Sequence, residues 1–213
     1  MLEVFGIIAA LAATPSAAPG AEPCTHGPVP KSIVSIVERK GASPVRPYAV
    51  VTFSVAPDGT VVSSSLLETS GNPGDDTDAL EASKHWEFLP AKNGCKPVSG
   101  TATFTLPMDE GSAAAIAPLT IADPCNHESL LVSGVAPYYP YEAKDKNHYT
   151  SFISVGVDGV GRLVDIGLQT SSGNPNVDRA AWHAASRSAY TGKVSACQAS
   201  DGTYTFKANF DPK

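Results

Sequence analysis

Two cysteines of this chain are each followed, two residues later, by a histidine. Cys24-Thr25-His26 and Cys125-Asn126-His127 could supply thiolate and imidazole ligands to a metal ion such as Zn²⁺. The other two cysteines, Cys95 and Cys197, follow at almost equal distances along the chain. In an oxidising compartment matched cysteines form disulfides, and thiolate ligands survive poorly. We therefore predict that Cys24 pairs with Cys95 and Cys125 with Cys197, and keep a metal site as the less favoured alternative.

Two neighbouring carboxylates could act as an acid and a base. Asp75 and Asp76 stand together just before a helical pattern, where the positive end of a helix dipole explains acidic residues without catalysis. His85 and His183 are the other candidate bases, but the internal repeat described below does not align them. The sequence contains no Gly-x-Ser-x-Gly, Ser-x-x-Lys, His-Glu-x-x-His or phosphate-loop motif. We predict that the chain is not an enzyme and uses no metal or cofactor.

The bulk composition is typical of an ordered globular protein. The chain has 213 residues, of which 42% are hydrophobic, enough to bury a core in one large or two small domains. Its formal net charge is −6, and it has no run of basic residues that could match a phosphate backbone. Nucleic acid is therefore not an expected partner.

The first residues have the features of an export signal. Residues 4–13 form an apolar run, and Ser16, Ala17 and Ala18 are small residues of the kind that signal peptidase accepts. Pro15 and Pro19 interrupt the run too early for a membrane-spanning helix. We predict a cleaved signal peptide over residues 1–18, a periplasmic or secreted location, and no transmembrane anchor in the mature chain.

An internal repeat organises the remaining sequence. Ser70-Gly71-Asn72-Pro73 recurs as Ser172-Gly173-Asn174-Pro175, an offset of 102 residues, and the same offset aligns Gly59 with Gly161. Two copies of one small domain explain these matches. We predict domain 1 over residues 19–107, a linker rich in Ala, Gly, Ser and Pro over residues 108–123, and domain 2 over residues 124–213.

Each copy shows the same order of strand and helix patterns. Apolar and polar residues alternate over 51–55 and 153–157, which predicts strands with one buried face. A second strand follows a glycine turn, a helix follows Ser-Gly-Asn-Pro, and a last strand alternates apolar residues with polar ones, mostly threonine. Short helices are also expected over 31–40 and 140–146. This order predicts an α+β fold, with a three-stranded antiparallel sheet, two helices on one side, and the last strand as an exposed edge.

The pattern resembles the C-terminal domain of the TonB family. In copy one, Trp86-x-Phe88-x-Pro90-Ala91 is similar to the family's Trp-x-Phe-x-Pro-Ala. In copy two, Tyr139-Pro140-x-Glu142-Ala143 is similar to the family's Tyr-Pro-x-x-Ala, and the run 171–181 matches best of all. Copy one lacks the Tyr-Pro motif, and copy two has Ser188, Gly192 and Lys193 in place of Trp, Pro and Ala. The resemblance implies two tandem TonB C-terminal-like domains.

The resemblance also implies protein binding without catalysis. The third strand of such domains accepts a short extended segment of a TonB-dependent outer-membrane transporter by strand addition, so the chain would be ancillary to transmembrane transport. Two alternatives stay open: the edges pair with each other or in a homodimer, or the chain is a structural or envelope-stress module that keeps the fold without binding transporters. The partner-binding residues that the resemblance implies are Thr203, Tyr204, Thr205, Phe206, Lys207 and Ala208 in copy two, Thr101, Thr103 and Thr105 in copy one, and Tyr139 and Pro140.

Overall fold

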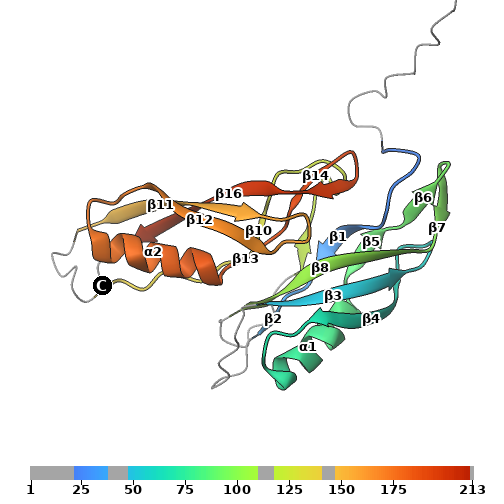
Figure 1. Cartoon of the computed structure of the whole chain (residues 1–213), viewed down its shortest axis with the longest axis horizontal. Coiled ribbons are helices and arrows are strands. Elements are labelled where there is room, and N and C mark those ends of the chain that lie inside the picture. Colours follow the sequence, from blue (N-terminus) through green and yellow to red (C-terminus); the bar gives the residue numbers. More distant parts are fainter. Residues whose placement is uncertain (1–21, 38–47, 110–117, 141–146, 212–213) are drawn as a thin grey trace, which may run out of the picture.

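The computed structural model describes residues 22–37, 48–109, 118–140 and 147–211, and the structural statements below concern this part of the chain. It shows two similar bodies, each with an antiparallel sheet and an α-helix packed against it (Figure 1). We call residues 22–109 the first repeat and residues 125–211 the second repeat. The α+β class with mostly antiparallel sheets is as the sequence predicts.

The central elements of the two repeats correspond at the offset of the sequence repeat. The first repeat contains β3 (Tyr48–Val55), β4 (Val61–Glu68), α1 (Pro73–Ser83) and β8 (Gly100–Asp109). The second repeat contains β11 (Tyr149–Val157), β12 (Leu163–Thr170), α2 (Pro175–Arg187) and β16 (Gly202–Phe210). The strand order β8-β3-β4 of the first repeat is therefore repeated as β16-β11-β12 in the second.

Short strands complete each repeat. β1 (Val29–Ile33) lies between β5 (Glu87–Leu89) and β9 (Leu119–Thr120), and β10 (Leu131–Ser133) pairs with β13 (Ala189–Tyr190). Two hairpins project from the sheets. They are β6 (Ala91–Asn93) with β7 (Lys96–Val98), and β14 (Lys193–Ser195) with β15 (Gln198–Ser200).

The prediction of a helix over 31–40 is wrong for residues 31–37, the part of this range that the structure describes. These residues instead form the end of β1 and the two-residue strand β2 (Ile36–Val37), which runs parallel to the end of β8. Ile33, Val34, Ile36 and Val37 are β-branched, which favours strands, and the neighbouring strands supply backbone partners. The first sheet therefore has four strands rather than three. The helix expected over 140–146 lies outside the described residues except for Pro140, and the predicted signal peptide lies wholly outside them.

The segment predicted as a linker, 108–123, belongs to the fold at both of its described ends. Met108 and Asp109 continue β8 alongside β2, and Leu119 and Thr120 form β9 alongside β1. Ile121 is buried in the core of the first repeat. Both described parts of this segment therefore pack on the first repeat.

The long strands bury one face, as their alternation predicts. Val51, Phe53 and Val55 of β3 and Ile153 and Val155 of β11 are fully buried. The two cores are filled differently. In the first core, four aromatic rings pack against one another: Phe53, Trp86, Phe88 and Phe104. In the second core, α2 packs five small apolar residues against the sheet: Val177, Ala180, Ala181, Ala184 and Ala185.

The Ser-Gly-Asn-Pro motif starts each helix. Asn72 caps α1 by accepting hydrogen bonds from the backbone N–H groups of Gly74 and Asp75, and Asn174 caps α2 by accepting one from the N–H of Asn176. The proline that follows suits the first helical position, where the missing N–H has no cost. The motif is therefore explained by helix initiation.

Candidate functional site: two sheet edges

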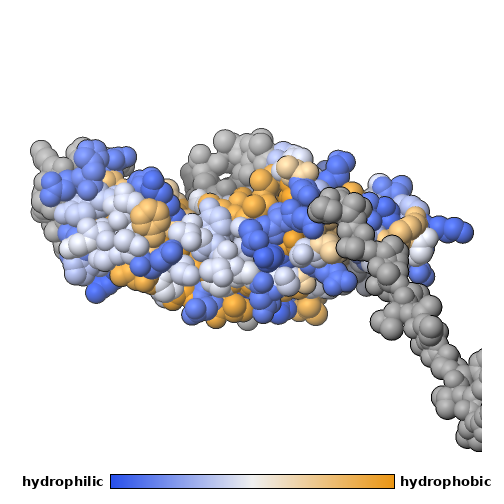
Figure 2. All heavy atoms as spheres, turned by 90° about the horizontal axis from the view of Figure 1, so that it is seen from above, coloured by the Kyte–Doolittle hydropathy of each residue, from blue (hydrophilic) through white to orange (hydrophobic). Residues whose placement is uncertain are grey.

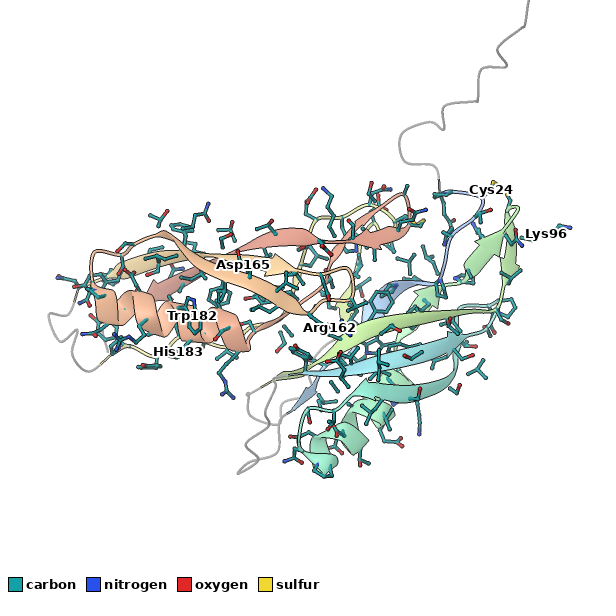
Figure 3. All side chains as sticks on the ribbon, in the orientation of Figure 1. Cys24, Lys96, Arg162, Asp165, Trp182 and His183 are labelled. Carbon is teal, nitrogen blue, oxygen red and sulfur yellow. A yellow bond between two sulfur atoms is a disulfide. The ribbon has the colours of Figure 1, made fainter. Side chains whose placement is uncertain are left out.

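The cysteines form the two predicted disulfides. Cys24 is bonded to Cys95 and Cys125 to Cys197, each within its own repeat. Both disulfides tie the segment before the sheet to the hairpin that precedes the last strand, and Figure 3 shows Cys24 beside that hairpin of the first repeat. Two disulfides are typical of proteins that mature in an oxidising compartment.

The cysteine and histidine pairs do not provide a metal-binding set. Glu22, Cys125 and Cys197 place ligand atoms within 4.8 Å of one another, but the two sulfurs are bonded to each other and offer no thiolate. The buried ring of His26 is held instead by Glu22 through Nε2, at 2.8 Å, and by the Gly27 carbonyl through Nδ1, at 2.6 Å. Glu22 also accepts a hydrogen bond from Lys92 at 2.6 Å. These contacts fasten the start of the first repeat.

Asp75 and Asp76 are buried in the first turn of α1, and the Asp76 carboxylate binds the turn that precedes the helix. Asp76 accepts hydrogen bonds from the Ser70 N–H and hydroxyl, both at 2.8 Å, and from the Thr69 hydroxyl. Burial opposes ionisation of Asp76, but these hydrogen bonds outweigh it and lower the pKa of the carboxyl. Asp178 of the second repeat is held in the same way by Ser151, Ser171 and Ser172, and its pKa is lowered for the same reason.

The histidines considered as bases lie apart from these carboxylates. His85 follows the end of α1 and is exposed, and His183 is exposed on α2 beside the ring of Trp182 (Figure 3). His85 and His183 belong to different repeats, after the end of α1 and within α2, at positions that do not correspond.

The candidate strand edge of the second repeat is open. β16 pairs along its whole length with β11, and on its other side no strand pairs with it among the residues that the structure describes. Thr203, Thr205 and Lys207 are exposed, whereas Phe206 and Ala208 are buried and Tyr204 is half-buried. An unpaired edge presents backbone donors and acceptors to any extended chain. The candidate residues 203–208 therefore lie together on one accessible edge.

The equivalent edge in the first repeat is largely occupied. The Thr105 N–H of β8 donates to the Val160 carbonyl of the second repeat at 2.8 Å, and β2 covers the far end of the strand. Thr105 is only 6% exposed. Thr101 is exposed and Thr103 half-buried, with the Thr103 hydroxyl bonded to that of Thr52 at 3.2 Å. Of the three candidates on β8, Thr105 thus already has a partner within the chain.

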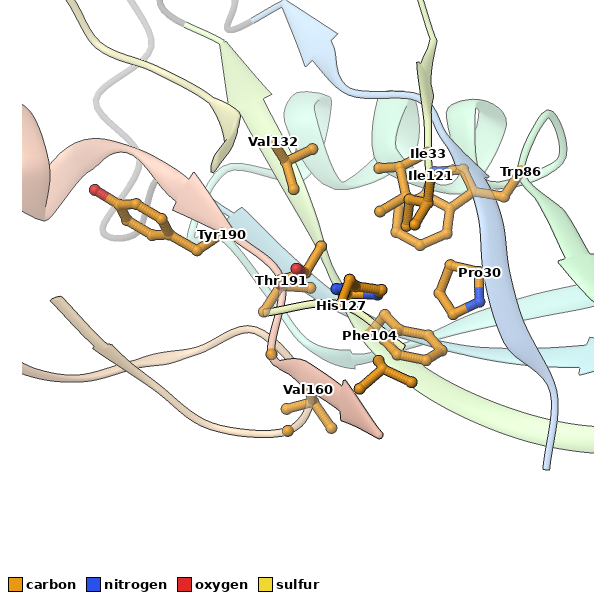
Figure 4. A pocket seen from close by; sticks show the side chains of 14 residues that line it. Pro30, Ile33, Trp86, Phe104, Ile121, His127, Val132, Val160, Tyr190 and Thr191 are labelled. Carbon is orange, nitrogen blue, oxygen red and sulfur yellow. The ribbon is translucent and has the colours of Figure 1, made fainter. Parts of the chain in front are cut away.

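The two repeats meet through an apolar joint. Around Thr105, the turn of the second repeat and its β13 region close over Trp86 and Phe104 of the first, leaving a cavity of about 20 Å³, room for about one water molecule (Figure 4). Beside the cavity, Val29 packs with Val194 and the Cys125–Cys197 disulfide. Arg162 forms an ion pair with Glu68 across the joint at 2.6 Å. In Figure 2 apolar residues likewise gather near the middle of the face shown, and the end at the left is largely hydrophilic or neutral.

Tyr139 and Pro140 lie near the last residue of the open edge. The Tyr139 ring meets the Phe210 ring edge-on with 6.4 Å between centroids, and its hydroxyl donates to the Asn147 carbonyl at 3.0 Å. Tyr139 is half-buried and Pro140 is buried. The structure therefore brings Tyr139 to the end of β16, where its ring packs against the core of the second repeat.

The sequence reasoning missed the residues that close the joint. Val160, Tyr190 and Arg162 stand in or beside elements that the repeat predicts, but nothing in their spacing says that they contact the other copy. Gly161 lies at this contact, but the aligned Gly59 shows that the glycine itself does not mark it. The φ of Gly161 is +94°, and a side chain there would collide with the Tyr190 carbonyl and the Thr105 hydroxyl. Gly59 has the same conformation, with φ +90°, and a side chain there would collide with the Phe88 carbonyl of its own repeat.

A groove of about 410 Å³ borders the turn of the first repeat. Its lining includes Asp58, Gly59 and Thr60 from the turn and Lys84 and His85 from the end of α1. The corresponding turn of the second repeat lies against β8. The groove therefore borders a turn whose equivalent in the second repeat forms the contact between the repeats.

The chain was compared with family models, curated proteins and solved structures. No family model, curated protein or solved structure matches the chain. Among the described residues, no helix is both long enough and apolar enough to cross a membrane.

Proposed function

We propose that this chain is a non-enzymatic, exported protein-interaction module that binds an extended segment of a partner protein by strand addition along β16. The observation that carries the proposal is the contrast between equivalent strands: β8 is covered by β2 and Val160, whereas β16 pairs on one side and has no strand on the other among the residues that the structure describes. Strand addition obtains affinity from main-chain hydrogen bonds and selectivity from alternate side chains.

The outward backbone groups of β16 can be assigned by correspondence. Thr105 directs its N–H away from β3, and successive residues of a strand point their backbone groups to alternate sides. The register that pairs Val50 with Thr105 is repeated as Phe152 with Lys207. Lys207, Thr205 and Thr203 therefore direct N–H and C=O groups to the open side.

The partner class follows from the resemblance to TonB C-terminal domains. The best candidate is the N-terminal segment of a TonB-dependent outer-membrane transporter, which would make the chain a periplasmic component ancillary to transport. The exposed ammonium group of Lys207 would favour a segment with an acidic residue beside it. The two disulfides support the exported location that this partner requires.

Titration calorimetry with synthetic peptides from transporter N-terminal segments tests the proposal. We expect binding heat with the parent protein and none with Thr205→Pro, because proline removes an outward N–H of β16. Thr205→Val keeps that N–H and should retain binding. Thr103→Pro removes the equivalent N–H of β8 and should leave binding at β16 intact. Absence of heat with the parent protein, or unchanged binding by a folded Thr205→Pro, would contradict the proposal.

The rival function, a structural module without a transporter partner, is favoured by one observation. The Thr105 to Val160 hydrogen bond shows that an edge of this type can serve packing within the chain. The same titration separates the two functions, since a purely structural module gives no heat with any of the peptides.

A further inference from the structure

The joint between the repeats joins unlike surfaces. One surface is the β11–β12 turn of the second repeat, in which Val160 offers its carbonyl; the other is the β8 edge of the first repeat, in which Thr105 offers its N–H. Such a contact is heterologous, so it uses one surface of each body and leaves the other surface of each body free.

Each repeat carries both surfaces because the two share one backbone plan. The free turn is the β3–β4 turn of the first repeat, where Asp58 occupies the place of Val160. The free edge is β16, where Lys207 occupies the place of Thr105. Exposure agrees with this assignment, since Asp58 and Lys207 are exposed while Val160 is half-buried and Thr105 is buried.

The turn conformation needed for docking is conserved between the repeats. In the second repeat, Gly161 donates its N–H to the Asp158 carbonyl at 2.9 Å, and in the first Gly59 donates to the Ala56 carbonyl at 3.0 Å. Both glycines have positive φ. The free turn therefore presents the Asp58 carbonyl as the docked turn presents that of Val160.

The residues that differ between the used and free surfaces are complementary in charge. Val160 and Thr105 are neutral, whereas Asp58 and Lys207 carry opposite charges. The Asp58 carboxylate accepts hydrogen bonds from the N–H of Thr60 at 3.0 Å and from the Thr60 hydroxyl at 2.7 Å, which fix its orientation. Lys207 lies over the Phe152 ring, with Nζ 6.0 Å from the ring centroid, and remains exposed. Opposite charges at these positions steer the free turn towards the free edge.

We propose that copies of this protein associate head to tail, the β3–β4 turn of one molecule docking on the β16 edge of the next, with Asp58 against Lys207 and the Asp58 carbonyl accepting the Lys207 N–H. The second copy repeats between molecules the contact that already joins the repeats within one. A heterologous contact of this kind produces rings or open chains according to whether its rotation closes. The inference does not rest on the proposed function, although an extended segment bound along β16 would displace the neighbouring copy.

Sedimentation velocity over a range of protein concentrations tests the association. We expect the average sedimentation coefficient of the parent protein to rise with concentration. Asp58→Lys and Lys207→Glu should each shift this rise about tenfold or more to higher concentration, because each places like charges in the contact. Lys96→Glu and Asp165→Lys change exposed charges away from both surfaces (Figure 3) and should not shift it.

Mixing the two end variants identifies the contact as head to tail. Lys207 of the Asp58→Lys variant can meet Asp58 of the Lys207→Glu variant, so an equimolar mixture should associate at concentrations where neither variant does alone. A parent protein that stays monomeric at all concentrations, or a mixture no more associated than its components, would overturn the proposal. Failure here is distinguishable from failure of strand addition, because Asp58→Lys leaves β16 open and should bind transporter peptides as the parent does.

Discussion

The last strands of the two repeats, β8 and β16, occupy equivalent places in their sheets, yet within the described part of the chain only β8 has a neighbour on its outer side. The difference lies both in the backbone, because β2 pairs with β8, and in the side chain at one equivalent position. Thr105 is small and neutral and fits beneath Val160, whereas Lys207 at the same position is charged and exposed. A duplicated domain can thus use one edge for its own assembly and keep the other for a partner.

The cores of the repeats differ in a related way. Trp86 and Phe104 of the first core also line the joint, so the aromatic cluster supports the second repeat as well as its own sheet. In the second repeat Ser188 stands at the place of Trp86, and its hydroxyl donates to the Ala184 carbonyl at 2.8 Å. The second core has aromatic contacts of its own, Tyr190 with Tyr204 and Tyr139 with Phe210, but it has no tryptophan at the position of Trp86.

The disulfides give the largest expected difference between the repeats. Replacing either cysteine pair with alanine should cost about 4 kcal/mol of unfolding free energy by loop-closure entropy. Cys125 and Cys197 are also buried against Val29 of the first repeat, whereas Cys24 and Cys95 are exposed. We therefore expect Cys125→Ala/Cys197→Ala to lose more stability than Cys24→Ala/Cys95→Ala in chemical denaturation. Equal losses would show that the second disulfide contributes nothing to the joint.

Trp86 offers the next largest effect. Its ring lies 5.0 Å from that of Phe53, its Nε1 donates to the Val34 carbonyl at 2.9 Å, and it is 3% exposed. Trp86→Ala should therefore lower the unfolding free energy by about 3 to 4 kcal/mol. Ser188→Ala, the matched change in the second repeat, removes a hydroxyl and should cost about 1 kcal/mol. Denaturant titration of both variants decides this, and comparable losses would refute the different roles of the two cores.

The turn carboxylates should behave alike in the two repeats. Asp76→Asn and Asp178→Asn should each lower stability at neutral pH by about 2 kcal/mol, since each removes a charged hydrogen-bond acceptor. Both pKa values are lowered by folding, so the stabilisation is complete above the unfolded value near 3.8 and is lost as the pH falls through the folded value. Thermal unfolding between acid and neutral pH should show a weaker acid dependence in the variants. An unchanged dependence would contradict this role.

The ion pair across the joint should contribute least. Arg162 and Glu68 are partly exposed, so Arg162→Gln should cost about 0.5 kcal/mol or less at ordinary salt. The stability difference from the parent protein should shrink further at high salt. A loss above about 2 kcal/mol would mean that Arg162 holds the joint together in a way that a surface ion pair does not.

Local sequence signals predicted the elements within each repeat, because their causes are local. Alternation gave the buried faces of β3 and β11, and Ser-Gly-Asn-Pro gave the helix starts. The disulfide pairs followed from matched spacing. The region 31–37 was beyond such reasoning, because β-branched residues there become strands only where β5, β8 and β9 supply partners.

The candidate edge of β16 could be predicted, but its difference from β8 could not. Both strands have the same alternation, and the contact that separates them joins Thr105 to Val160, residues far apart in the sequence. No periodicity records such a contact. The aligned repeats show that Lys207 stands at the position of Thr105. This exchange does not say which edge is covered unless one already knows that the second repeat packs against β8.

Amide hydrogen exchange at Thr105 and Lys207, measured residue by residue by NMR, tests the contrast between the two edges most directly. The account predicts that the Thr105 N–H is protected by Val160 at every protein concentration. In dilute protein, the Lys207 N–H should exchange rapidly and become protected when a transporter peptide is added. Rapid exchange at Thr105, or strong protection at Lys207 in the dilute protein without a peptide, would contradict the account.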